Sequence, residues 1–189
     1  KNIPVEVIES RLPVMVDQAG LRPDSGGAGE YRGGLGSIRD YRFLAPFGAL
    51  TILKKSATFG WGLKGGKPGP KNLTVLHPNT NHPEWQKHMD QDITIYADHD
   101  EAYENTDETK KYCGQFRGEF HAGDMIRYLA DGGGGYGEPF HRPAEKVRED
   151  VIDGLVSRKA AETDYGVILS EELDINWSET NRLRGISAQ

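Results

Sequence analysis

Alternating apolar and polar side chains predict β-strands along the first two thirds of the chain. Such alternation is typical of strands that bury one face. Pro46 and Gly48 form a predicted turn, so the stretch after it is expected to complete a hairpin with the stretch before it. The predicted strands cover residues 5–7, 14–16, 37–44, 49–55, 72–76, 92–96 and 123–129. The stretch 37–44 alternates poorly and is predicted as a strand because it is rich in branched and aromatic residues.

A helical period replaces this alternation after residue 142. Pro143 suits the first position of a helix, and the predicted helix ends at Gly154. One face of this helix is apolar, which indicates that it packs against a core. The face consists of Ala144, Val147, Val151 and Leu155.

Two capping signals predict two further helices. Ser157 is expected to cap a second helix, which stops before Gly166. Asn176, with Glu179 three residues later, resembles a capping box for a last helix. A short strand over 167–169 is expected between these two helices.

The predicted fold class is therefore α+β and mainly β. Glycine-rich antiparallel strands fill residues 1–140, with an acidic insertion at about 77–118, and a helical tail follows over 141–189. We expect the two regions together to form one compact unit of a larger assembly.

Three clusters of glycine, at 26–36, 60–69 and 132–137, interrupt the strands. Glycine loses much backbone entropy on folding, so it favours places where the chain turns sharply or another backbone comes close. Charged residues punctuate the first cluster, which is therefore no flexible Gly/Ser spacer. We predict ordered loops, and we hypothesise that the three clusters pack together.

These clusters could also hold phosphate through successive backbone amides. Gly66-Lys67 is followed by Pro68, which has no amide hydrogen and does not match a P-loop. The third cluster is followed by Glu138-Pro139 and not by the helix that a dinucleotide fingerprint requires. Tight turns and close backbone packing are thus the expected role.

Size and charge narrow the class of protein. A chain of 189 residues suffices for one domain, and its single cysteine, Cys113, excludes an internal disulfide and suits a reducing cytoplasm.

The net charge of −6 lies entirely between residues 82 and 121, a stretch that contains ten acidic and four basic side chains. The absence of a basic stripe argues against nucleic acid, and no apolar run reaches the length of a membrane span. The first residues carry no signal peptide and read like a chain joined in mid-protein.

Several ordered blocks resemble the C-terminal part of the hydantoinase B/5-oxoprolinase family, which includes B-type components of N-methylhydantoinase, 5-oxoprolinase and acetone or acetophenone carboxylase. A single glycine cluster would be weak support, but the blocks occur in the family's order and reach almost both ends of the chain. They comprise residues 9–13, 21–29, 31–36, 61–69, 132–139, 150–157, 160–161 and 165–167.

The resemblance implies part of a multi-subunit, ATP-dependent enzyme. Family members work with a hydantoinase A-type subunit that binds ATP and phosphorylates a carbonyl oxygen of the substrate. The B-type component then helps to hydrolyse a cyclic amide or to carboxylate a ketone, because a phosphorylated oxygen is a good leaving group. ATP, with Mg²⁺ or Mn²⁺, is therefore expected on the partner or elsewhere in the complex, and no cofactor is assigned to this chain.

Two departures limit what carries over from the family. The chain matches only the C-terminal third of B-type components, and the family's metal and base residues lie in the missing portion. We therefore assign no catalytic residue and expect the chain alone to be inactive. The segment 77–118 is longer than the usual connection, which suggests an interface or an access lid.

Arg22 and Arg32 flank the first glycine cluster and are candidate substrate-binding residues. Arginine can bind a carboxylate or a phosphate through two parallel hydrogen bonds. The alternative is that they form ion pairs with Asp24 and Glu30.

A metal site is the weaker candidate. His77, His82 and His88 lie in the acidic segment and are ligands that zinc accepts, but their spacing fits no standard site. Other ligand types in the same segment are Asp98, His99, Asp100 and Cys113.

The function predicted is that of a C-terminal segment or split subunit of a B-type component. Its partners would be the A-type subunit, the N-terminal portion of the B-type component and a small amide or ketone substrate, in the cytoplasm. The alternative is a non-catalytic assembly module that docks partner subunits through its acidic insertion.

Overall fold

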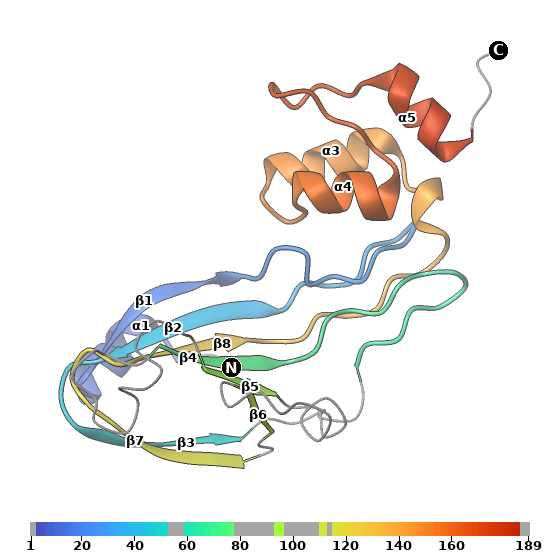
Figure 1. Ribbon diagram of the computed structural model, residues 1–189. Coiled ribbons are helices and arrows are strands. Elements are labelled where there is room, and N and C mark those ends of the chain that lie inside the picture. The colour runs from blue at the N-terminus through green and yellow to red at the C-terminus, as the bar shows by residue number, and fades with distance from the viewer. Residues whose placement is uncertain (1–2, 53–58, 78–92, 97–109, 113–114, 186–189) are drawn as a thin grey trace. The chain divides into compact units, whose positions relative to one another are not determined.

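The computed structural model describes residues 3–52, 59–77, 93–96, 110–112 and 115–185, and confirms a mixed α+β fold (Figure 1). None of the described helices is long and apolar enough to span a membrane. The helices are α1 (Val5–Arg11), η2 (Pro139–His141), α3 (Ala144–Ile152), α4 (Arg158–Tyr165) and α5 (Trp177–Arg184). The strands are β1 (Val14–Leu21), β2 (Ser37–Phe43), β3 (Phe47–Ile52), β4 (Leu73–His77), β5 (Ile93–Tyr96), β6 (Lys110–Tyr112), β7 (Gln115–Phe120) and β8 (Met125–Leu129).

Contacts between residues divide the chain into two units, each assembled from three segments. Unit 1 comprises Lys1–Gly20, Ser37–Thr58 and Lys71–Ala130, and unit 2 comprises Leu21–Gly36, Phe59–Pro70 and Asp131–Gln189. The glycine clusters thus belong with the helices in unit 2, and the division predicted at residue 140 stays a prediction. That the whole chain acts as one compact unit stays a prediction.

Unit 1 is built on a sheet with the strand order β1-β2-β8-β4-β5-β6 and on a second sheet of β3 and β7. The predicted hairpin between 37–44 and 49–55 is wrong. In the register of the first sheet Asp40 lies opposite Arg127, whereas in the second sheet Ala49 lies opposite Gly118. Strand β2 has neighbours on both edges, β1 and β8, so it offers no free edge to β3.

The core of unit 1 lies between the faces of these strands. Val14, Phe43, Phe120 and Ile126 are buried together, and the rings of Phe43 and Phe120 stack with centroids 4.4 Å apart. Burial of each such side chain contributes about 1.5–3 kcal/mol. The predicted strand at 37–44 is confirmed as β2, and its Phe43 side chain lies in this core.

The predicted strand at 5–7 is wrong, because these residues begin helix α1. Val5, Ile8 and Leu12 have the helical spacing of three and four residues, which overrides the short alternation of Val5 and Val7. Glu6 in the first turn and Arg11 in the last turn complement the helix dipole. Helix α1 has no buried residue, although Ile8 packs against the core.

Two strands in the acidic segment were not predicted. Strand β7 pairs with β3, and the short β6 pairs in parallel with β5. Strand β6 lies within the segment 77–118, most of which is outside the described residues. The insertion itself therefore stays a prediction.

The three predicted helices of the tail are confirmed in unit 2. Ser157 Oγ accepts a hydrogen bond of 3.1 Å from the amide of Ala160, and Asn176 Oδ1 accepts one of 3.2 Å from the amide of Glu179. The Glu179 carboxylate pairs with Arg182, so only half of the capping box forms. The expected strand at 167–169 is reduced to a single bridge between Leu169 and Ile175. The helices enclose a core of Ala144, Val147, Val156, Ala161, Tyr165 and Val167 together with Ala28.

Candidate functional site

The three glycine clusters meet in unit 2, which confirms that they pack together. The amide of Gly27 donates to the carbonyl of Gly133 at 2.8 Å, and the amide of Gly133 donates to Gly34 at 2.8 Å. The amide of Gly135 donates to Lys67 at 2.9 Å. All three clusters thus exchange backbone hydrogen bonds with one another.

Close approach of backbones, more than unusual torsion, explains these glycines. A Cβ atom on Gly33 would overlap the carbonyl oxygen of Gly133, and one on Gly134 would overlap that of Trp61. Neither Gly33 nor Gly134 has a positive φ, so an L-residue would suit their torsion and fail only on space. Gly137, with φ +75°, is a case where torsion itself favours glycine.

The hydrogen bonding of these clusters also bears on phosphate binding. A phosphate nest needs successive amides that point at a ligand. Here the amides of Gly27, Gly33, Gly133 and Gly135 each donate to a carbonyl of the chain. The arrangement therefore fits an architectural role, and it offers no nest for ATP along these four residues.

Arg32 lies in a buried cluster of charges and not beside its predicted alternative partners. Its Nε and Nη2 donate to the carboxylate of Asp150 in α3 at 3.2 and 3.1 Å. Arg142 Nη2 donates to the same carboxylate at 2.8 Å. The Asp24 carboxylate instead accepts a hydrogen bond of 2.7 Å from the amide of Ser157.

This cluster carries one positive charge in excess, since two guanidinium groups share one carboxylate. The side chains of Arg32, Arg142 and Asp150 are only 16%, 12% and 10% exposed. Tyr165 lies close enough to feel all three charges, and burial, partly offset by Arg142 and Arg32, raises the pKa of its phenol to about 12. The Arg32–Asp150–Arg142 cluster therefore joins the first glycine cluster to α3.

Arg22 precedes the first glycine cluster in the chain, and it is half-buried. Burial lowers the pKa of Arg22, and the carboxylate of Asp131 opposes that effect. Its carbonyl accepts a hydrogen bond of 2.5 Å from Ser25 Oγ. A substrate-binding role for Arg22 and Arg32 stays a prediction.

The predicted metal ligands are only partly described. His77 lies at the end of β4, opposite Met125 of β8. His82 and His88, like Cys113, lie outside the described residues. Within the described part of the chain no group of three or more His, Cys, Asp or Glu side chains is placed to hold a metal ion.

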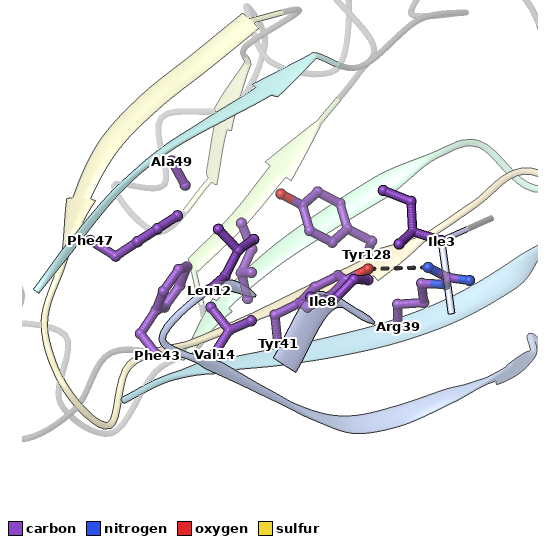
Figure 2. Close-up of a pocket in the computed structure, with 11 residues that line it drawn as sticks. Ile3, Ile8, Leu12, Val14, Arg39, Tyr41, Phe43, Phe47, Ala49 and Tyr128 are labelled. Carbon is purple, nitrogen blue, oxygen red and sulfur yellow. Dashed lines mark hydrogen bonds between the residues drawn. The ribbon is translucent and has the colours of Figure 1, made fainter. Parts of the chain in front are cut away.

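Unit 1 contains a pocket of about 410 Å³ that sequence reasoning missed (Figure 2). Helix α1, strands β1 to β3 and strand β8 line it, and its walls are almost entirely apolar. Arg39 is the charged side chain in this lining, and its Nη1 donates to Tyr41 Oη at 3.2 Å. The rings of Tyr41 and Tyr128 meet edge to face with centroids 5.9 Å apart. The signal in the sequence was an arginine on the same face of β2 as Tyr41 and Phe43.

A size of about 300–1,000 Å³ and apolar walls with few polar groups are typical of small-molecule sites. The arrangement can bind and orient an apolar molecule, but it presents no nucleophile beside a base. We therefore regard this pocket as a candidate binding site rather than a catalytic centre.

The family model for hydantoinase B/oxoprolinase matches residues 1–139 of the chain. An uncharacterised protein of Methanocaldococcus jannaschii is 32% identical over 98% of this chain and 29% of its own length. Caprolactamase subunit beta of Pseudomonas jessenii is 31% identical over 95% of this chain and 27% of its own length. The chain thus spans less than a third of the length of these relatives.

Two solved structures share this fold. The ATP-dependent caprolactamase from Pseudomonas jessenii has a TM-score of 0.71 and 26% identity, covering 96% of this chain and 28% of its own. A nucleotide-free acetone carboxylase has a TM-score of 0.63 and 21% identity, covering 98% of this chain and 26% of its own. At 21% identity, the similarity to the acetone carboxylase shows a shared fold only.

Proposed function

Because the chain belongs to the hydantoinase B/oxoprolinase family, we propose that it is the C-terminal segment or a split subunit of a B-type component in an ATP-dependent complex. The complex would hydrolyse a cyclic amide or carboxylate a ketone through a phosphorylated intermediate. The main support for this proposal is the share of each protein that the structural match covers. The likeness to the caprolactamase takes in 96% of this chain but only 28% of that one.

In this proposal the chain supplies architecture, and the reacting groups lie in other parts of the complex. The interlocked glycine clusters and the Arg32–Asp150–Arg142 cluster support this role, because the polar groups of both form hydrogen bonds within the chain. ATP and its Mg²⁺ or Mn²⁺ would bind to the A-type subunit or elsewhere in the complex.

Reconstitution tests the proposal. The chain is mixed with the N-terminal portion of a B-type component and with the A-type subunit, and ATP hydrolysis and product formation are followed. Hydantoin, 5-oxoproline, a lactam and acetone serve as the substrates. Turnover that depends on all three polypeptides is expected, and turnover that is unchanged when this chain is omitted would contradict the proposal.

The alternative function is a non-catalytic assembly module. The concentration of the net charge of −6 between residues 82 and 121 favours it, because an excess of acidic side chains suits a basic partner. Neutralising acidic residues in this segment should then weaken co-purification of the partner subunits, with a steep dependence on salt. If the complex needs this chain to assemble but its turnover does not depend on the chain, the result would favour the non-catalytic assembly module.

A further inference from the structure

We propose that the pocket of unit 1 binds a small apolar monocarboxylate, with the carboxylate on Arg39 and the apolar body along the pocket. This goes beyond the proposed function and does not depend on it. The inference rests on one unmatched charge and on the walls of the pocket around it.

Arg39 differs from two other arginines of the same sheet in that it has no acidic partner among the described residues. Arg127 is paired with Asp40 at 2.7 Å, and Arg42 is paired with Asp17 at 2.7 Å. Among the described residues Arg39 forms no ion pair, and its bond to the Tyr41 hydroxyl leaves further N–H groups without a protein acceptor. A guanidinium presents five N–H donors in a planar fork that matches a carboxylate.

The pocket surrounds this cation with an unusually apolar environment. Val14, Phe43 and Ile126 in its walls are buried core residues. Figure 2 shows Arg39 at one end of the pocket and Phe47 and Ala49 of β3 at the other. A molecule with one anionic end and an apolar body satisfies both ends. A polyol or a dicarboxylate would instead leave polar groups unpaired against the walls.

The competing explanation is that the Arg39 stem merely packs along the apolar surface while its head stays in water. In that case the arginine would give no preference for an anionic ligand. The head group of the ligand is therefore the variable that separates the two explanations.

Calorimetric titration of the full chain with octanoate tests the proposal. Octanoate is expected to bind, while octan-1-ol and octylamine bind at least tenfold more weakly and acetate gives no measurable heat. Arg39→Gln should weaken octanoate binding at least tenfold, and Ala49→Phe, which fills the apolar end, should weaken it as well. Arg42→Gln is the matched control, because this paired arginine on the same strand does not line the pocket.

Thermal unfolding of each variant verifies that it is folded, so a loss of binding reports on the pocket. Equal affinity for octanoate and octan-1-ol, or unchanged affinity in Arg39→Gln, would overturn the proposal. So would a failure of octanoate to bind. If the N-terminal portion of a B-type component instead protects Tyr41 and Tyr128 from chemical modification, the pocket is a polypeptide contact.

Discussion

Arg32 and Asp150, which lie 118 positions apart in the chain, are joined by two hydrogen bonds in the interior of unit 2. Arg142 binds the same carboxylate, so one aspartate holds a glycine cluster, the segment before α3 and α3 itself. Loss of either partner from a buried ion pair leaves an uncompensated charge, which is far more costly than loss of an exposed pair. Asp150 is therefore the point at which unit 2 is most sensitive to a change of charge.

Asp150→Asn should destabilise the chain by about 3 kcal/mol, because two guanidinium groups would then be buried without a counter-charge. Chemical denaturation measures the effect as a change in the free energy of unfolding. Asp174→Asn is the control, since its carboxylate also pairs with an arginine, Arg148, but is 78% exposed. It should cost less than about 1 kcal/mol. Similar losses of unfolding free energy in the two variants would show that burial does not make the ion pairs of Asp150 more important for stability.

Gly33→Ala and Gly34→Ala should have opposite effects although the residues are adjacent. The new methyl group at 33 would overlap the Gly133 carbonyl, which predicts a loss of about 3 kcal/mol. A Cβ atom added to Gly34 would meet no atom within 4 Å apart from its chain neighbours, and φ there is not positive, so reduced entropy of the unfolded chain should stabilise by about 0.5 kcal/mol. Thermal unfolding of both variants checks the sign, and equal behaviour would refute close backbone packing.

Ser157→Ala should destabilise by about 1 kcal/mol, because the first turn of α4 would lose the acceptor for the Ala160 amide. Ser178→Ala, inside the exposed face of α5, is the control. It removes a hydroxyl of the same kind from the first turn of a helix that is capped by another residue, Asn176, so little change in stability is expected. A loss at Ser178 as large as that at Ser157 would mean that capping is not the cause.

The stability of the chain should fall as the pH rises from about 10 to about 12. Burial raises the pKa of Tyr165 to about 12, from an ordinary value of 10.0, so in this window the folded state keeps a proton that the unfolded state releases. The contribution is complete below pH 10 and is lost as the pH passes through the folded pKa. Tyr165→Phe should flatten this part of the stability profile. An equal slope in both chains would remove Tyr165 as its source.

Local signals in the sequence predicted the helical tail well. Ser157, Asn176 and the glycines at 166 and 185 act through neighbours a few residues away, so their effect on the chain does not depend on the rest of the fold. The glycine clusters were also interpreted correctly as packed together, because only close backbones explain so many ordered glycines.

Pairings between distant residues could not be predicted in this way. The partner of Arg32 was expected at Asp24 or Glu30 and is Asp150, because the fold brings α3 beside the first cluster. The hairpin of β2 and β3 failed for the same reason, since β8, far along the chain, takes the edge of β2. The pocket around Arg39 likewise needs five separate elements, and a single sequence gives no register for them.

The interleaving of the two units has a consequence for synthesis on the ribosome. The first glycine cluster is synthesised before its hydrogen-bond partners at 132–137, which follow the last residue of unit 1, Ala130. Unit 2 must therefore assemble late, through contacts between residues far apart in the chain, which is a slow kind of folding. A ribosome that stalls before residue 131 would hold a nascent chain in which the first two glycine clusters lack their hydrogen-bond partners at 132–137.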